Sequence, residues 1–266
     1  MNADSSTIPS ALESLDRLGN ALQDKTPALF FDYDGTLTPI VDRPDLAVMA
    51  EDMRKAVAGL AERCPVAIVS GRDREDVEQL VQLQGVFYAG SHGFDIAGPG
   101  GQHMQQTEME AFVPELRATE NEVRAALEGI EGSLVESKRY AFAVHYRLVA
   151  DADYPTVEAA VVAAEDAHPN LRRKGGKKVF EILPRMDWDK GKAVLWLLKA
   201  LDLERPDVLP FYMGDDLTDE DAFAALDGKG VGILVADAPQ ETRAQYRLND
   251  VNEMRTFLAE FTALLG

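Results

Sequence analysis

The sequence predicts a doubly wound α/β fold, a parallel sheet covered by helices on both faces, with a smaller α+β module inserted into it. Two observations lead to this prediction. Short apolar runs typical of buried strands alternate with amphipathic helical patterns in the first part of the chain and again near its end. Between these parts the alternation stops, and strand-like segments follow one another directly.

The expected parallel strands are short, apolar and followed by turn residues, and they span residues 28–32, 66–70, 86–89, 208–213 and 230–235. The helical patterns between them have apolar residues at helical spacing, and they span residues 45–63, 74–83, 190–201 and 219–226. A terminal strand and helix are expected from residue 236 onward. Strands and helices that alternate in this way form βαβ units with parallel strands.

The inserted module has the order helix, strand, strand, helix, strand, strand. Its segments span residues 115–128, 133–138, 140–147, 154–167, 171–174 and 177–183. The pair Gly175 and Gly176 is expected to form the turn of the last hairpin. This order indicates an antiparallel sheet with two helices on one face. We therefore expect a core domain of residues 1–107 and 188–266, interrupted by a second domain of residues 108–187.

Composition and charge narrow the function classes. The chain of 266 residues is 46% hydrophobic, so it can bury a large core, and its formal net charge is −19. Such a charge repels nucleic acid and anionic membranes, so we expect neither as a partner. No apolar stretch approaches the roughly 18 to 20 residues of a membrane helix, and the N-terminus lacks the pattern of a signal peptide. With a single cysteine, Cys64, the sequence indicates a soluble cytoplasmic protein.

The strongest motif places two carboxylates directly after the first predicted strand. Asp32 and Asp34 are two residues apart, and Gly35 and Thr36 follow them. Alternation along an extended chain directs both carboxylates to the same side. Asp32 can attack phosphorus to form an aspartyl-phosphate, and Asp34 can protonate the leaving oxygen and later activate water. The motif therefore predicts phosphoryl transfer rather than a plain acidic turn.

A second acidic cluster follows the strand at residues 208–213. It holds five acidic side chains within seven positions, and Asp215 is nearest to the strand end. Carboxylates repel a phosphate, so a cation is required, and hard oxygen ligands favour Mg²⁺. We expect Asp215 to bind this ion directly and Asp216 and Asp219 to hold its water ligands. Taken alone, the cluster also fits an acidic first turn of a helix.

Two further fragments supply donors and positive charge. Ser70 ends a predicted strand, so its hydroxyl and the backbone N–H groups of Gly71 and Arg72 can bind a phosphoryl oxygen, although a simple helix cap fits equally well. Lys190 begins a helix, where a cation opposes the helix dipole unless it faces an anion. We expect Lys190 to neutralise the nucleophile and the phosphate, with Lys192 as the alternative.

The side chains of this predicted site lie at the carboxyl ends of buried strands, the edge where parallel sheets bind their ligands. Other catalytic classes lack support. The four histidines show no zinc-binding spacing, and no P-loop motif is present.

These motifs resemble those of haloacid dehalogenase-like (HAD) phosphatases, which have a Rossmann-like core and an α+β cap. The resemblance covers nearly the whole chain and is more specific for trehalose-6-phosphate phosphatases. Its motifs are DYDGTLTPI from Asp32, Ser70-Gly71-Arg72, His92-Gly93, Lys190 and GDDLTDED from Gly214, and in the insert Glu136-x-Lys138, His145-Tyr146-Arg147 and the stretch from Gly176 to Glu181. Ser91, before His92, departs from the residue that relatives often have there.

The resemblance implies roles for individual residues. It makes Asp32 the nucleophile and Asp34 the general acid and base, and the backbone carbonyl of Asp34 joins Asp32 and Asp215 around Mg²⁺. Phosphate would contact Ser70, Gly71, Arg72 and Lys190. The implied substrate-binding residues of the turn and the cap are His92, Gly93, Glu136, Lys138, Arg147, Lys177 and Glu181.

Physical reasoning also supports a sugar-binding insert, because paired Lys and Glu side chains on neighbouring strands can bind hydroxyl groups. The alternative for these residues is a set of cross-strand ion pairs on a solvent face. We therefore expect a Mg²⁺-dependent phosphatase that converts trehalose 6-phosphate to trehalose. The rivals are another capped phosphatase, acting on sucrose 6-phosphate or a mannosyl phosphate, and a catalytically silent module that binds sugar phosphates.

Overall fold

The structure is a computed structural model that describes residues 3–105, 107–176 and 178–266. The chain forms two compact units. The first unit consists of Met1–Met104 and Trp188–Gly266, and the second of Gln105–Asp187.

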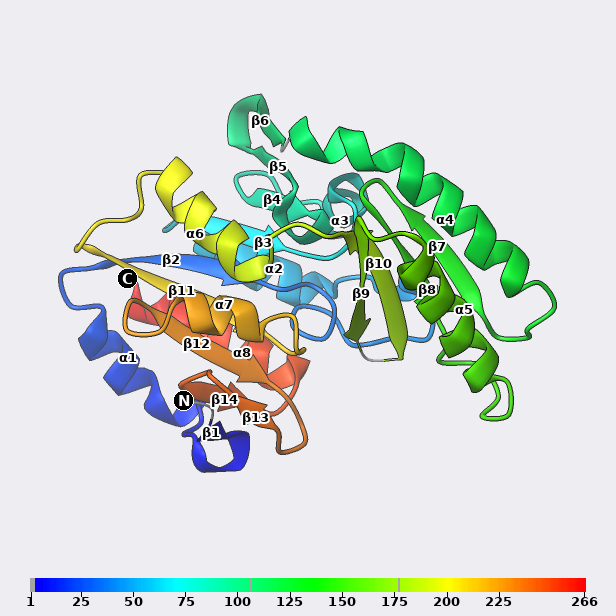
Figure 1. Cartoon of the computed structure of the whole chain (residues 1–266). Helices are drawn as coiled ribbons and strands as arrows, with labels where there is room; N and C mark the ends of the chain where they lie inside the picture. Colours follow the sequence, from blue (N-terminus) through cyan, green and yellow to red (C-terminus); the bar gives the residue numbers. More distant parts are fainter. Residues whose placement is uncertain (1–2, 106, 177) are drawn as a thin grey trace. The chain divides into compact units, whose positions relative to one another are not determined.

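The first unit is built on an eight-stranded sheet with the order β14-β12-β11-β2-β3-β4-β5-β6 (Figure 1). All its pairings from β14 to β4 are parallel, and β5 runs antiparallel to β4. The strands are β2 (Thr26–Phe31), β3 (Val66–Val69), β4 (Phe87–Gly90), β5 (Asp95–Gly98), β6 (Gln102–Gln105), β11 (Val208–Gly214), β12 (Val231–Val235) and β14 (Tyr246–Leu248). The predicted fold class is confirmed.

Helices cover both faces of this sheet. On one face, alternate strand side chains such as Phe31 and Met213 pack with α1, α2, α3 and α8 in one apolar cluster. On the other face, Phe30 and Tyr212 pack with α6 and α7 in a second cluster. The helices are α1 (Leu15–Ala21), α2 (Glu51–Ala61), α3 (Arg74–Val81), α6 (Lys190–Ala200), α7 (Glu220–Ala225) and α8 (Val251–Leu264). Because β2 and β11 are buried on both faces, they have the continuous apolar sequences that predicted them.

Several short elements were not predicted. These are α1, the strand β5 with its neighbour β6 at the edge of the large sheet, and the two-stranded pair of β1 (Ala3–Asp4) with β13 (Glu241–Thr242). They lie where Gly, Pro and polar residues interrupt the apolar pattern. An edge strand needs only part of its surface buried, so the signal that identifies central strands is weak there.

The second unit is a four-stranded antiparallel sheet with the order β7-β8-β10-β9 and two helices. Both helices pack on one face of the sheet, where Leu116 and Val161 meet Phe142 and Ile182 in a single apolar cluster (Figure 1). Its elements are α4 (Val113–Ala126), β7 (Leu134–Lys138), β8 (Ala141–His145), α5 (Tyr154–Ala167), β9 (Leu171–Gly176) and β10 (Val179–Pro184).

The predicted turn at the glycine pair is wrong. Gly175 and Gly176 belong to β9, where they pair with Phe180 and Val179 of β10. The connection comes after them, and Lys178 there has a φ of 67°. Burial of Phe180 and Ile182 against the helices fixes the register of this hairpin, and the local preference of glycine for turns does not.

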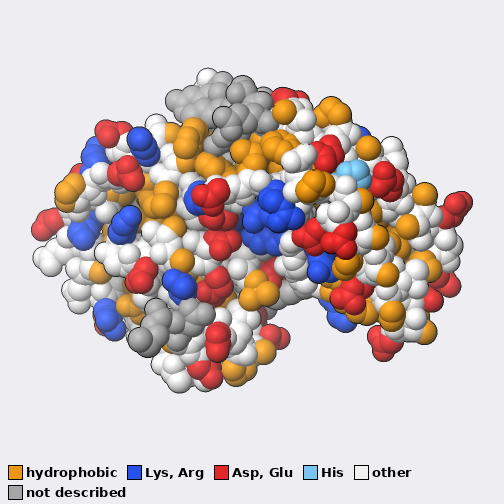
Figure 2. All heavy atoms as spheres, in the orientation of Figure 1, with side chains coloured by type: hydrophobic (Ala, Val, Ile, Leu, Met, Phe, Trp, Pro, Cys, Tyr) orange, Lys and Arg blue, Asp and Glu red, His pale blue; other side chains and the backbone are white. Residues whose placement is uncertain are grey.

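Acidic and basic side chains are interspersed over the face of the protein that Figure 2 shows. Among the residues described, no helix has both the length and the apolar character that a membrane span requires.

Candidate active site

The candidate site lies where three parallel strands of the first unit end together. Phe31 at the end of β2 pairs with Ile68 of β3 and with Met213 of β11. Asp32, the residue after β2, and Asp215, the residue after Gly214 at the end of β11, therefore emerge at one edge of the sheet. The Asp32 amide donates a hydrogen bond to the carbonyl of Met213 at 2.8 Å, which holds the two chain segments together at this point.

Gly35 allows the loop after β2 to pass beside Asp215. Its φ is +91°, and a Cβ atom at this position would overlap the Asp215 carboxylate. Only glycine meets both requirements without displacing the acidic side chain. The glycine of the first motif is thus explained by the approach of the second motif.

A buried lysine joins two of the acidic residues. Lys190 Nζ lies 2.7 Å from Asp32 Oδ1 and 2.7 Å from Asp219 Oδ1. Lys190 is the first residue of α6, whose N-cap Asp189 accepts a hydrogen bond from the amide of Lys192. The cation at this helix start is balanced by two carboxylates, as its position in the sequence predicted. Lys192, the alternative to Lys190, pairs with Asp189 instead.

The charges of this cluster shift one another's protonation. Burial raises the pKa of Asp32 well above its ordinary value; Lys190 opposes this shift, and Asp219 and Asp215 reinforce it. For Lys190, burial alone would lower the pKa, but Asp219 and Asp32 outweigh it and raise the pKa well above its ordinary value. Burial likewise works against the ionised form of Asp219, yet Lys190 lowers the pKa of that carboxyl. The raised pKa of Asp32 thus comes first from burial of its carboxyl and then from the neighbouring negative charges, and Lys190 only partly opposes these effects.

Asp219 holds the acidic loop in place. Its Oδ2 accepts hydrogen bonds from the amides of Asp215 and Asp216 at 3.0 and 2.9 Å. Its Oδ1 accepts from Tyr212 Oη at 2.6 Å as well as from Lys190. Asp216 is less buried, and its Oδ1 accepts from the amide of Leu217 at 2.7 Å.

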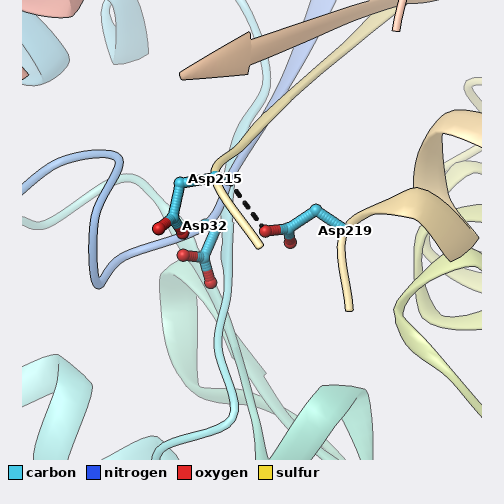
Figure 3. A group of neighbouring side chains, drawn as sticks. All are labelled: Asp32, Asp215 and Asp219. Atoms are coloured by element: carbon cyan, nitrogen blue, oxygen red, sulfur yellow. Dashed lines mark hydrogen bonds between the residues drawn. The ribbon is translucent and has the colours of Figure 1, made fainter. Parts of the chain in front are cut away.

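The carboxylates of Asp32, Asp215 and Asp219 suit a hard divalent cation. One oxygen of each lies within 4.8 Å of the others, and all three residues are buried (Figure 3). Figure 3 shows the Asp32 and Asp215 carboxylates next to one another, with Asp219 reaching them from the side of α7. Oxygen ligands of this type bind Mg²⁺ or Ca²⁺, and Mg²⁺ typically uses one or two carboxylates. Because Asp219 already accepts four hydrogen bonds, Asp32 and Asp215 are better placed to be the direct ligands.

Arg72 forms a two-bond ion pair with Asp34. The guanidinium Nε lies 2.7 Å from Asp34 Oδ2, and Nη2 lies 2.7 Å from Asp34 Oδ1. Arg72 also contacts Asp76 of α3 through Nη1 at 2.9 Å. The sequence predicted Arg72 as a phosphate ligand, and no contact in the structure tests that role.

The loops after β3 and β4 are tied together. Ser70, almost fully buried, has its Oγ accepting from the amide of Arg72 at 3.1 Å, and its carbonyl accepts from the amide of His92 at 2.8 Å. Gly71 lies against the His92 ring, and a Cβ there would be 2.9 Å from Cε1. Gly93, with a φ of +92°, packs against α6 where any side chain would overlap Ala193. The two loops thus bring these four predicted residues close together.

The insert places the predicted sugar-binding residues in a row across its sheet. Glu136 of β7 and Glu181 of β10 both pair with Ala143 of β8, so they share one face of the sheet. Lys138 Nζ reaches Glu181 Oε1 at 2.6 Å, and His145 Nε2 lies 2.7 Å from Glu136 Oε2. The Lys138 and Glu181 side chains are only 12% and 11% exposed, unlike ion pairs on a solvent face.

Two further residues were predicted to bind the sugar, Arg147 and Lys177. Arg147 is half-buried in the turn that follows β8. Lys177 lies outside the described residues.

Sequence reasoning missed two residues of the site. Tyr212 is a fully buried tyrosine inside an apolar strand, and its hydroxyl must find a partner, which is Asp219. The available signal was a tyrosine inside an apolar strand, shortly before the acidic loop that begins at Asp215. Asp76 contacts Arg72 at the i,i+4 spacing of a helix start, a pattern too common to single out alone.

Comparison with known proteins identifies the family. The trehalose-phosphatase family model matches residues 30–252. The chain belongs to the trehalose-phosphatase family. Its relatives in this family include trehalose 6-phosphate phosphatase RA3 of Zea mays, 45% identical over 97% of this chain and 76% of that protein. The trehalose-phosphate phosphatase of Mycobacterium tuberculosis is 43% identical over 98% of this chain and 66% of its own length. The predicted resemblance is confirmed.

Solved structures of phosphatases share the fold. The C-terminal domain of the Candida albicans trehalose-6-phosphate phosphatase superposes with a TM-score of 0.85 at 23% identity, covering 97% of this chain and 99% of that one. A sucrose-phosphatase from Synechocystis gives a TM-score of 0.55 at 17% identity, covering 89% and 98%. Trehalose-phosphatase family members and a sucrose-phosphatase thus share the capped HAD-like architecture.

Proposed function

We propose that this chain hydrolyses trehalose 6-phosphate to trehalose and inorganic phosphate, the last step of trehalose biosynthesis. The observation that carries the proposal is the meeting of Asp32, Lys190 and Asp215 at one sheet edge in a trehalose-phosphatase family member. Relatives that carry this activity in their names are 40–45% identical over most of the chain, which supports the same substrate here.

Asp32 is the proposed nucleophile. Its carboxylate attacks phosphorus, the bond from phosphorus to the sugar oxygen breaks, and the phosphoryl group stays on Asp32. Asp34 gives a proton to the leaving sugar oxygen and later takes one from the attacking water. Hydrolysis then releases phosphate and restores the Asp32 carboxylate. Lys190 limits the repulsion between Asp32 and the incoming phosphate.

We propose that Asp32, Asp215 and the backbone carbonyl of Asp34 hold Mg²⁺, with Asp216 and Asp219 supporting the ligands. The ion supplies charge neutralisation and polarises the phosphoryl oxygens when bound. Asp219 serves this arrangement by fixing the amides of Asp215 and Asp216 and the ammonium of Lys190. Ser70, Gly71 and the turn at His92 and Gly93 lie at the same strand ends and are the proposed phosphate and substrate contacts.

The second unit, Gln105–Asp187, is the proposed cap, for which the sequence predicted residues 108–187. Glu136, Lys138 and Glu181 form a polar row on one sheet face, which supports recognition of paired sugar hydroxyls. Arg147 and Lys177 complete the proposed sugar-binding set.

A phosphate-release screen over a panel of sugar phosphates, with and without a chelator, tests the proposal. We expect the highest kcat/KM with trehalose 6-phosphate and loss of activity in chelator that added Mg²⁺ restores. A tenfold preference for sucrose 6-phosphate or a mannosyl phosphate would contradict the proposed substrate. Binding of trehalose 6-phosphate without turnover would indicate a silent sugar-phosphate-binding module instead.

A further inference from the structure

Arg72 is one of the most constrained charged side chains at the candidate site. It is 8% exposed, and its guanidinium forms two hydrogen bonds with Asp34, one with Asp76 and one with the carbonyl of Pro44. Its Cζ atom also lies 5.6 Å from the centroid of the Tyr33 ring, within the range of a cation–π contact.

These contacts use four of the five N–H groups of the guanidinium. The contact with Asp34 is the forked, two-bond type, which fixes the plane of a carboxylate as well as its distance. A guanidinium with these contacts fixes the position of a carboxylate, and it would have to break several hydrogen bonds to reach a phosphate.

Asp34 needs such support because it lies in a loop. Its side chain is 35% exposed, and outside the fork a carboxylate there would sample several rotamers. Proton transfer to a leaving oxygen requires the donor within hydrogen-bond reach of that oxygen. Misplacement by about 1 Å can cost roughly a hundredfold in rate.

We propose that Arg72 is a positioning residue that orients Asp34 for acid–base catalysis, with Asp76 and the Tyr33 ring holding Arg72. This inference rests on the proposed function, because it assigns Asp34 to the protonation of the leaving group. It differs from a role in phosphate binding, which would affect every phosphate ester alike.

Leaving groups separate the two roles. The parameter kcat/KM reports the first chemical step, in which trehalose departs as a poor leaving group that needs a proton. The phenolate of p-nitrophenyl phosphate departs without one. In Arg72→Gln, we expect kcat/KM for trehalose 6-phosphate to fall about a hundredfold and that for p-nitrophenyl phosphate by less than about threefold.

Further variants sharpen the test. Arg72→Lys keeps the charge but loses the fork, so its loss on the alkyl ester should be intermediate. Asp76→Asn should show a smaller loss of the same kind. Arg43→Gln is the matched control, since Arg43 is a 64% exposed arginine paired with Asp45, and it should leave both substrates unchanged. Thermal unfolding of each variant checks the fold, and Arg72→Lys and Asp76→Asn carry the test where Arg72→Gln does not fold.

A double-mutant cycle tests whether Arg72 acts through Asp34. In Asp34→Asn, the further change Arg72→Gln should have no additional effect on the alkyl ester. Equal losses on both substrates, no loss on either, or additive effects in the double variant would overturn the inference. The proposed substrate is contradicted separately if the wild-type protein does not hydrolyse trehalose 6-phosphate. The losses in kcat/KM are then compared between glucose 6-phosphate, as the alkyl ester, and p-nitrophenyl phosphate.

Discussion

At the scale of single residues, the site concentrates carboxylates that repel one another. One carboxylate oxygen from each of Asp32, Asp215 and Asp219 lies within 4.8 Å of the others, and Lys190 pairs with Asp32 and Asp219. Burial raises the pKa of Asp32 most, and the negative charges of Asp219 and Asp215 raise it further. Binding of a divalent cation should therefore stabilise the folded protein as well as support catalysis.

The variant Asp215→Asn tests this charge balance. It removes one carboxylate, so the temperature of unfolding measured without metal should rise. Mg²⁺ at a hundred times its Kd should stabilise the wild-type protein by about 2.7 kcal/mol and the variant far less. Differential scanning fluorimetry measures both effects. The exposed variant Asp45→Asn is the control, and an unchanged Mg²⁺ shift in Asp215→Asn would argue against Asp215 as a ligand.

At the scale of elements, Lys190 is the first residue of α6, so the N-cap of this helix helps to position the Lys190 side chain in the site. Asp189 and Asp250 are the N-caps of α6 and α8: the Asp189 side chain accepts a hydrogen bond from the amide of Lys192, and that of Asp250 accepts from the amides of Asn252 and Glu253. Replacing either by Ala should cost about 1 kcal/mol of unfolding free energy. Only Asp189→Ala should also lower kcat, because it loosens the helix start that places Lys190. Equal kcat values in the two variants would contradict this coupling.

Glu120 of α4 links the helix to β7 of the insert. The carboxylate is 4% exposed and accepts hydrogen bonds from Arg117, Arg124 and Ser137. Burial works against its charge, but these donors outweigh it and lower the pKa of Glu120. A lowered folded-state pKa gives stability that is present above the ordinary glutamate value and lost as the pH falls through the folded-state pKa.

The variant Glu120→Gln keeps the size of the side chain and removes its charge. We expect it to lower the unfolding temperature at pH 7, with a cost of about 1–3 kcal/mol. The difference from wild type should begin to shrink as the pH falls below about 4.3, the ordinary glutamate value. A difference that grows on acidification would contradict the assigned direction of the shift.

At the scale of the whole molecule, the sequence predicted which strand ends form the site far better than it predicted the side-chain contacts between their loops. Buried parallel strands have continuous apolar sequences, so the ends of β2, β3 and β11 were evident, and with them the meeting of Asp32 and Asp215. The fork from Arg72 to Asp34 depends on loop geometry over 38 residues of sequence, which no local pattern encodes. The bond from Tyr212 to Asp219 is set by packing in the same way. The hairpin turn was misplaced because tertiary burial outweighed the turn preference of glycine.

The division of labour between the two units can be tested by substrate choice. In Glu181→Gln, which disrupts the polar row of the insert, KM for trehalose 6-phosphate should rise about tenfold, because a site that binds hydroxyls loses a partner. Hydrolysis of p-nitrophenyl phosphate should change little, since this ester has no sugar. Glu158→Gln on the exposed side of α5 is the control. Equal losses on both substrates in Glu181→Gln would contradict a role in sugar recognition.

Chemical trapping of the phosphorylated residue tests the central mechanistic claim most directly. With p-nitrophenyl phosphate, departure of the leaving group is fast and the aspartyl-phosphate should accumulate. Acid quenching and borohydride reduction convert an aspartyl-phosphate to homoserine, which peptide mass spectrometry locates. We predict homoserine at position 32 and loss of turnover in Asp32→Asn. Homoserine at another position, or full turnover in Asp32→Asn, would contradict the account.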